Sequence, residues 1–183
     1  MNVLITGARA GFGKALAERL IANGHRVIGC ARRLDKRNAL AETLGEAFLP
    51  VVMDVSDTAS IPQIIADLPA DFKQIDVLVN NAGLALGTEP AHKASLDDWM
   101  RMNDTTIKGL MALTHAVLPA MVARDSGYII NVGSIAGSWP YFGGNVYGAT
   151  KAFVKQFSLN LRADLIGTQV RVTNLEPGNV AGT

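Results

Sequence analysis

The 183-residue chain lacks an excess of charge of either sign, and it contains a single cysteine. Its 17 Lys and Arg residues nearly balance its 16 Asp and Glu residues, so the formal net charge is +1. No basic field therefore argues for a nucleic-acid partner, and no acidic excess argues for disorder. Because one cysteine cannot form an internal disulfide, Cys30 is expected to be a packing residue.

Long uncharged apolar segments are also missing, since none reaches the ~20 residues that a membrane-spanning helix needs. The first strand-like run begins directly after Met1, with no charged leader or cleavage site before it, which favours a cytoplasmic protein. Hydrophobic residues make up 49% of the chain and charged residues 18%, enough for a substantial core. The length and the absence of a linker predict one domain over residues 1–183.

Short apolar runs alternate with longer segments of helical period, which is the pattern of strand–helix–strand units around a parallel sheet. The predicted strands are residues 2–6, 26–30, 48–53, 75–80, 128–132 and 170–175. The predicted helices are residues 11–22, 35–44, 61–68, 96–123 and 145–166. We therefore predict an α/β fold, a doubly wound parallel sheet of the Rossmann type with strand order 3-2-1-4-5-6.

Proline and glycine positions agree with this assignment. Pro50 would remove a ladder hydrogen bond, which is tolerated at an edge, and the third strand is an edge in the predicted order. Three glycines stand just past predicted helices, where helices commonly end: Gly24, Gly45 and Gly167. Ser95 and Asp98 have the spacing of a capping box for the helix over residues 96–123.

A glycine-rich turn joins the first predicted strand to the first helix, with the sequence Thr6-Gly7-Ala8-Arg9-Ala10-Gly11-Phe12-Gly13. Such a turn lets backbone approach a pyrophosphate, and the helix N-terminus supplies free N–H donors and partial positive charge. The strand before it and the helix after it are the context that this motif requires. We predict a cofactor site at Gly7, Arg9, Gly11, Phe12 and Gly13, with a purely structural turn as the alternative.

Two arginines, Arg32 and Arg33, follow the second predicted strand. An acidic side chain near this point would hydrogen-bond the ribose of NAD, whereas arginine suits the 2′-phosphate of NADP. NADP is therefore the predicted cofactor, and two solvated arginines at a helix start are the alternative. Asp54, with Val55 beside it, follows the third strand; its carboxylate could cap a loop or hydrogen-bond adenine.

Tyr147 and Lys151 lie four residues apart on a predicted helix, so both project from one face. An unperturbed tyrosine has a pKa of about 10, and a neighbouring ammonium lowers it by stabilising the phenolate. Tyr147 can then act as a general acid or base. Ser134 directly follows the fifth strand, at the sheet edge where ligands bind, and its hydroxyl can hydrogen-bond a substrate oxygen. Taken alone, a Tyr-x-x-x-Lys pair is more often a surface feature of a helix than a catalytic one, and Ser134 is equally typical of an ordinary turn at a strand end.

Together, these motifs stand in the order and spacing of the short-chain dehydrogenase/reductase family, which the chain resembles over almost its whole length. The matching motifs are Thr6-Gly7-x-x-x-Gly11-x-Gly13, Asn80-Asn81-Ala82-Gly83, Ser134, Tyr147-x-x-x-Lys151 and Pro177-Gly178. The stretches NNAGLALGTEPAHKAS and GSWPYFGGNVYGATKAF are similar to bacterial NADP-dependent 3-hydroxy acid dehydrogenases, which also oxidise serine and allo-threonine.

The resemblance implies hydride transfer between NADP(H) and a carbon that bears a hydroxyl or carbonyl group. Tyr147 would exchange the proton, Ser134 would orient the substrate oxygen, and Lys151 would bind the nicotinamide ribose and tune Tyr147. Asn80, Ala82 and Gly83 would line the cofactor channel, and Val180 or Thr183 would hold the carboxamide of the nicotinamide. Pro177 and Gly178 would also bind the cofactor. No metal is implied, and the relatives are generally tetramers.

The chain departs from the family pattern at Thr106. Aligning Trp99 and Lys108 with that pattern places Thr106 where members usually carry an asparagine that holds a water in a proton relay to the lysine. A threonine cannot both donate through an amide and accept through a carbonyl, so the relay is in doubt. Asn103, one helical turn earlier, is an alternative relay residue.

The second departure is the end of the chain, because relatives continue with a further strand and helices that cover the substrate. We therefore expect a C-terminally truncated domain without that strand and lid, whose sixth strand is an exposed edge. An NADP-binding protein with little catalysis, acting as a sensor or interaction partner, is the alternative to the enzyme. A helical stripe fits either core packing or a subunit contact: Phe153, Phe157, Leu161 and Leu165.

Overall fold

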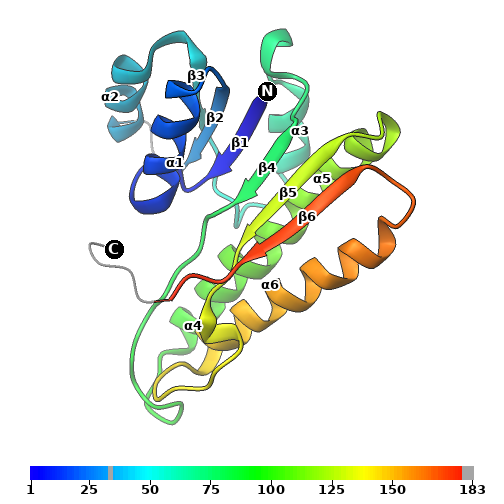
Figure 1. Ribbon diagram of the computed structural model, residues 1–183. Coiled ribbons are helices and arrows are strands. Elements are labelled where there is room, and N and C mark those ends of the chain that lie inside the picture. The colour runs from blue at the N-terminus through cyan, green and yellow to red at the C-terminus, as the bar shows by residue number, and fades with distance from the viewer. Residues whose placement is uncertain (33–34, 179–183) are drawn as a thin grey trace.

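Helices cover both faces of a six-stranded parallel sheet in the computed structural model, which describes residues 1–32 and 35–178 (Figure 1). The strand order is β3-β2-β1-β4-β5-β6, and each neighbouring pair is parallel. This is the predicted order. Pro50 lies in the edge strand β3, as expected, and β6 is the other edge within the described residues.

The strands are β1 (Asn2–Thr6), β2 (Arg26–Ala31), β3 (Phe48–Val52), β4 (Val77–Asn80), β5 (Gly127–Val132) and β6 (Val170–Leu175). The helices are α1 (Gly11–Ala22), α2 (Asp35–Leu44), α3 (Ile61–Ala66), α4 (Leu96–Asn103), α5 (Gly109–Ala123) and α6 (Asn145–Asp164). Short helical turns are η1 (Gly45–Ala47), η2 (Ala70–Phe72), η3 (Asp104–Lys108) and η4 (Ile135–Gly137). The predicted elements are all present, and their ends move by one or two residues at most.

The alternation of side chains along β1 explains why both faces of the sheet carry helices. Leu4 points into a core shared with α3, α5 and α6, whereas Val3 and Ile5 point into a second core shared with α1 and α2. Successive residues of a strand face opposite sides, so a strand with two covered faces is apolar throughout. The unbroken apolar run of β1 is therefore explained by the burial of both faces of this strand.

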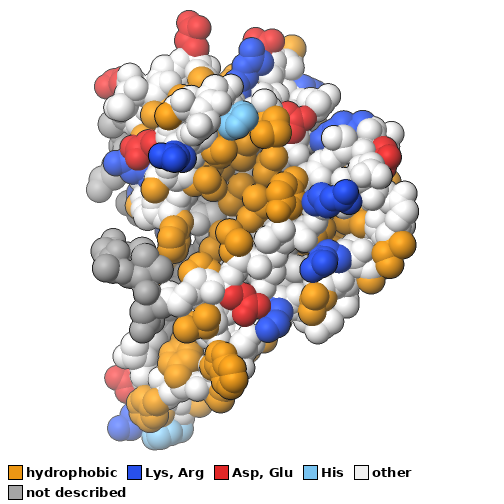
Figure 2. Space-filling view, viewed as in Figure 1, with side chains coloured by type: hydrophobic (Ala, Val, Ile, Leu, Met, Phe, Trp, Pro, Cys, Tyr) orange, Lys and Arg blue, Asp and Glu red, His pale blue; other side chains and the backbone are white. Residues whose placement is uncertain are grey.

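The α1–α2 layer covers only part of its face of the sheet. Ile130 and Val132 of β5 pack against that core only partly, and Tyr128 and Leu175 are 36% and 48% exposed. Figure 2 shows apolar side chains gathered over the middle of this view, where β4 and β5 lie in Figure 1. Within the described residues, no helix covers this side of β5 and β6.

The helix α4 continues through η3 into α5, which makes one helix from Leu96 to Ala123 as predicted. By length and apolar composition alone it is able to cross a membrane, but Leu113, Val117 and Met121 are buried in the core beneath the sheet. Ser95 Oγ accepts a hydrogen bond from the Asp98 backbone N–H (3.3 Å), which is half of the predicted capping box. The π-helical turn η3 inside this helix was not predicted.

Buried polar side chains connect the neighbouring strands β4 and β5 to the helices beneath them. Asn80 Nδ2 donates hydrogen bonds to Thr114 Oγ1 (3.2 Å) and to Asn131 Oδ1 (2.9 Å). Asn131 Nδ2 donates to Ser158 Oγ (2.9 Å), and Ser158 Oγ donates to the Val154 carbonyl (2.7 Å). Because each member lies away from water, losing one leaves its partners unsatisfied. This network ties α5 and α6 to β4 and β5 directly below the strand ends.

We expect Asn131→Ala to lower the free energy of unfolding by about 2 to 3 kcal/mol, since it removes one of the two hydrogen-bond partners of both the buried Asn80 amide and the buried Ser158 hydroxyl. Urea denaturation measures the effect. Asn160→Ala on the exposed face of α6 is the matched control and should change the stability by no more than about 0.5 kcal/mol. Equal losses in the two variants would contradict a stabilising role for the network.

Candidate active site

A cavity of about 290 Å³ opens where β1, β2, β3 and β4 end. It is lined by Gly7, Arg9, Ala10, Cys30, Ala31, Arg32, Met53, Asp54, Val55, Ala82, Gly83, Leu84 and Thr105. The carboxyl ends of parallel strands form the ligand crevice of a doubly wound sheet, so the cavity lies where the fold class places a ligand. Seven of the predicted cofactor residues line it: Gly7, Arg9, Arg32, Asp54, Val55, Ala82 and Gly83. Thr105 also lines it and was not predicted.

The glycine turn is shaped by close backbone contacts. Gly7 has φ +67°, and a Cβ added to Gly13 would lie 2.4 Å from the Gly7 carbonyl oxygen, so α1 starts directly against the turn. Ala10 precedes α1 and provides no side-chain cap, which leaves the first N–H groups of the helix available to an anion. Gly11 and Gly13 shape this turn without lining the cavity, and Phe12 is 45% exposed.

Thr6 and Asn81, which belong to the family motifs but were given no role from the sequence, join this turn to the loop after β4. Thr6 Oγ1 accepts the backbone N–H groups of Asn81 (3.0 Å) and Ala82 (2.9 Å). The Asn81 amide donates to the carbonyls of Thr6 (2.9 Å) and Gly7 (3.3 Å). The predicted cofactor residue Asn80 is instead buried in the polar network beneath the sheet. Asn81, rather than Asn80, holds the glycine turn in place, because its side chain points toward the end of β1.

Arg9 and Arg32 both line the cavity, so two cations from separate loops face one space. Asp54 lines it too, while its Oδ1 accepts hydrogen bonds from the Ser56 N–H (2.9 Å) and hydroxyl (2.6 Å). Asp54 therefore caps the loop through Oδ1, as one of the two predicted roles required, and its Oδ2 is available to hydrogen-bond a ligand. Cations and free N–H donors fit a phosphate-bearing group such as NADP. The predicted residue Arg33 lies outside the described residues.

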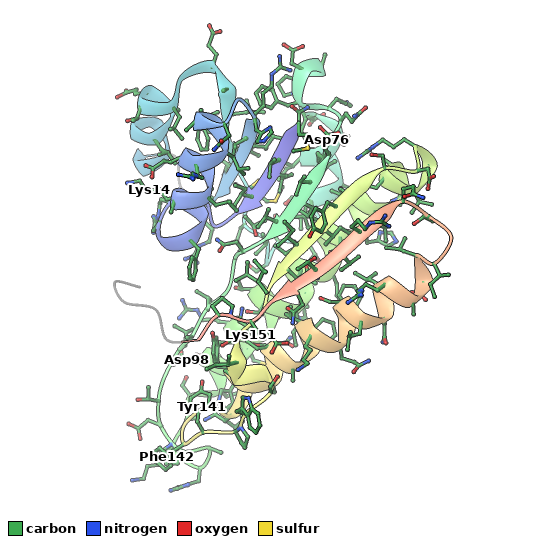
Figure 3. All side chains as sticks on the ribbon, in the orientation of Figure 1. Lys14, Asp76, Asp98, Tyr141, Phe142 and Lys151 are labelled. Atoms are coloured by element: carbon green, nitrogen blue, oxygen red, sulfur yellow. The ribbon has the colours of Figure 1, made fainter. Side chains whose placement is uncertain are left out.

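Lys151 is buried beside Tyr147 at the start of α6. Its Nζ lies 5.9 Å from the centre of the Tyr147 ring and donates a hydrogen bond to the Val132 carbonyl (2.8 Å). A Cβ added to Gly83 would lie 3.3 Å from this Nζ, so the cavity loop approaches the ammonium closely. Burial lowers the pKa of Lys151 to about 8. Figure 3 shows Lys151 where α6 meets the strand ends.

Ser134 lies in a turn that packs directly on the backbone of α6. Its Oγ accepts the Ala136 N–H (3.1 Å), which leaves the hydroxyl proton free to be donated. A Cβ added to Gly137 would lie 2.6 Å from the backbone of Lys151, and one added to Gly148 would lie 2.9 Å from the Ala136 carbonyl oxygen. Larger residues at these glycines would push the Ser134 turn away from Tyr147 and Lys151.

Thr106 is almost completely buried in η3, and its Oγ1 has no hydrogen-bond partner among the described residues. A Cβ added to Gly83 would lie 3.7 Å from this oxygen, which places Thr106 on the same side as Lys151. The π-helical turn thus directs a free hydroxyl toward the catalytic helix. Asn103, the alternative relay residue, donates to Asp104 Oδ1 (3.5 Å).

Two loops far apart in the sequence pack together beyond Tyr147 and Lys151. Asn145 Oδ1 accepts the Trp99 indole N–H (3.0 Å), and Asn145 Nδ2 donates to the Glu89 carbonyl (3.0 Å). Gly143 has φ +77°, and an added Cβ would lie 2.3 Å from the Thr88 carbonyl oxygen. The segment before α6 therefore packs against the loop that follows β4, and Figure 1 shows the two loops extending together beyond the sheet.

Tyr141 belongs to one of these loops and lies near Tyr147. Burial, followed by the charge of an ionised Tyr147, raises the pKa of Tyr141. Tyr141 therefore remains a neutral hydrogen-bond donor near neutral pH. Figure 3 labels Tyr141 and Phe142 in the lobe below the sheet, where Phe142 is 80% exposed.

Pro177 and Gly178 lie beside the Ser134 turn, as a shared site requires. The Pro177 carbonyl accepts the Ile135 N–H (3.1 Å), and a Cβ added to Gly178 would lie 3.6 Å from Ile135 Cδ1. The predicted carboxamide-binding residues Val180 and Thr183 lie outside the described residues. In the described part of the chain, no cluster of three or more His, Cys, Asp or Glu residues is placed to hold a metal ion.

The lowered pKa of Lys151 predicts a pH-dependent stability. The ammonium is charged in both states below about pH 8, whereas between about 8 and 10.5 the native state loses the proton first. The free energy of unfolding of the wild-type protein, compared with that of Lys151→Met, should therefore rise with pH across that window by up to about 3 kcal/mol. Urea unfolding of both proteins at several pH values tests this; parallel pH profiles would count against a buried ammonium.

Comparison with known proteins agrees with this geometry. The chain matches the short chain dehydrogenase family over residues 1–183. It is 62% identical over 183 residues to the NADP-dependent 3-hydroxy acid dehydrogenase YdfG of Salmonella typhi, covering 100% of this chain and 74% of that protein. It is 51% identical over 177 residues to the serine 3-dehydrogenase of Agrobacterium fabrum, covering 97% of this chain and 71% of the relative.

A solved structure extends the likeness to three dimensions. The closed form of serine dehydrogenase complexed with NADP⁺ superposes with a TM-score of 0.98 at 59% identity, covering 100% of this chain and 73% of that one. The family match spans every strand, the glycine turn and the helix that carries Tyr147 and Lys151. The chain therefore belongs to the short-chain dehydrogenase/reductase family.

Proposed function

We propose that the protein is an NADP-dependent oxidoreductase that interconverts a small 3-hydroxy acid, such as serine, and the corresponding carbonyl compound. The observation that carries the proposal is the buried ammonium of Lys151 beside Tyr147, next to a cavity with two arginines. Relatives with 51% to 62% identity are named for 3-hydroxy acid and serine dehydrogenation, and a close structural neighbour is complexed with NADP⁺.

NADP, when bound, supplies the hydride acceptor for oxidation of the substrate alcohol. Tyr147 takes the hydroxyl proton as the general base, with the ammonium of Lys151 beside its ring. The Ser134 hydroxyl donates a hydrogen bond to the substrate oxygen and holds it near Tyr147. Arg9 and Arg32, whose side chains line the cavity, would hold the 2′-phosphate of NADP. In the reverse direction, Tyr147 returns the proton to the carbonyl oxygen.

We also propose a cytoplasmic homo-oligomer, a tetramer by family resemblance. Leu161 and Leu165 of the predicted stripe are buried in the protein's own core, so they are not available to a partner. Phe153 and Phe157 stack on each other (5.5 Å between ring centres) and are half-buried, and Phe157 also packs against that core. The accessible part of these rings supports a contact through α6, which size-exclusion chromatography tests.

We expect Tyr147→Phe to lower NADP-dependent oxidation of serine or 3-hydroxypropionate by about 10²- to 10⁴-fold, because it removes the proton acceptor. NADPH absorbance measures the rate, and the NADP-induced rise in melting temperature should persist. Tyr128→Phe is the matched control, since that hydroxyl bonds Thr173 on the exposed sheet face. A cofactor-induced melting shift without turnover in the wild-type protein would instead indicate an NADP-binding sensor or interaction partner.

We expect Arg32→Ala to raise the KM for NADP about tenfold and to leave the KM for NAD nearly unchanged, because only NADP carries the 2′-phosphate. Steady-state kinetics with both cofactors measure this ratio. Arg171→Ala removes an exposed arginine from β6, away from the cavity, and serves as the control. A parallel loss for NADP and NAD would contradict phosphate recognition by Arg32.

A further inference from the structure

The carboxylate of Glu176 joins three segments around the proposed active site. Its Oε2 accepts the Ser138 hydroxyl (3.1 Å), and its Oε1 accepts Asn174 Nδ2 (3.0 Å) and lies 3.4 Å from Lys155 Nζ. Lys155 Nζ also donates to Ser138 Oγ (2.7 Å). Ser138, Lys155 and Glu176 thus form a closed ring of contacts between the turn after β5, the helix α6 and the end of β6.

The backbone places Glu176 directly opposite Ser134. The N–H of Gly133, just before Ser134, donates to the Leu175 carbonyl (2.6 Å), and the N–H of Ile135, just after it, donates to the Pro177 carbonyl (3.1 Å). Leu175 and Pro177 are the two neighbours of Glu176 in the chain. The two hydrogen bonds that hold the Ser134 backbone therefore depend on the position of the segment centred on Glu176.

The other side of the ring is anchored to the catalytic helix. Lys155 lies one helical turn after Lys151 on α6, so the helix presents one lysine to Tyr147 and the next to Glu176. The Ser134 turn touches the α6 backbone at Lys151 through Gly137, which has no side chain to hold it there. On the far side of that turn, the Ser138 hydroxyl accepts a hydrogen bond from Lys155 and so adds a side-chain connection to α6.

We propose that Glu176 is a positioning residue: through Ser138 and Lys155, its carboxylate holds the Ser134 turn in register with Tyr147 and Lys151. The inference rests on the proposed oxidoreductase function. Glu176 acts through Ser134, since its carboxylate is engaged by Ser138, Asn174 and Lys155. The ion pair is partly exposed, with side chains 43% and 29% accessible, so its loss leaves the fold intact. Small displacements of a reacting group nevertheless have large effects on rate.

We expect Glu176→Ala in the full chain to lower kcat for serine oxidation about tenfold and to change the KM for NADP less than twofold. Lys155→Met should reproduce the loss, and Lys155→Arg, which retains the ion pair, should remain within about twofold of wild type. Glu18→Ala breaks another surface ion pair, with Lys14 at 3.7 Å, and is the control expected to keep full activity.

Hydrogen exchange followed by mass spectrometry supplies a readout that does not need turnover. The peptide over residues 133–138 should exchange faster in Glu176→Ala than in wild type or Glu18→Ala, because the Gly133 and Ile135 N–H groups lose their fixed partners. Unchanged exchange, or faster exchange with full kcat, would overturn the proposal. A wild-type chain without turnover would contradict the proposed function, and the exchange result would still decide whether Glu176 holds the turn.

Discussion

The hydrogen bond from the buried Lys151 ammonium to the Val132 carbonyl is the interaction around which the site is built. It joins α6 to the end of β5, and it holds a positive charge beside Tyr147 and within reach of the loop at Gly83. Burial of an ammonium is unfavourable, which is why its pKa falls to about 8. The surrounding structure must therefore be stable enough to keep it there.

The doubly wound sheet supplies that stability and brings the functional loops together. Because all six strands are parallel, their carboxyl ends meet on one edge, and residues from Gly7 to Gly178 lie around it. Beneath that edge, Asn80, Asn131 and Ser158 connect β4 and β5 to α6 through satisfied hydrogen bonds. The residues of the proposed active site lie at the strand ends, directly above this buried polar network, whose role is to stabilise the fold.

Much of this architecture was predictable because it follows from local patterns. Apolar runs predicted the strands, and Pro50 correctly indicated that β3 is an edge. The glycines after α1, α2 and α6 adopt positive φ values at Gly24, Gly45 and Gly167, as helix-ending residues do. The predicted ends of strands and helices differ from the observed ends by one or two residues, because a residue at such a boundary can adopt either the regular or the turn conformation. The π-helical turn at η3 has no local signal in the apolar period.

The sequence by itself determined the strands, the glycine turn and the pairing of Tyr147 with Lys151, because each depends on residues within a few positions of one another. The sheet order joins strands far apart in the sequence and was predictable only from the fold class that the alternating strands and helices indicate. Tertiary structure alone decided which asparagine at the end of β4 clamps the glycine turn, that Thr106 buries an unpaired hydroxyl, and that Glu176 lies opposite Ser134. Burial and hydrogen-bond partners are properties of chain segments that meet in space. Residues separated by 38 or more positions, such as Ser138 and Glu176, carry no mark of their contact until the sheet and α6 bring them together.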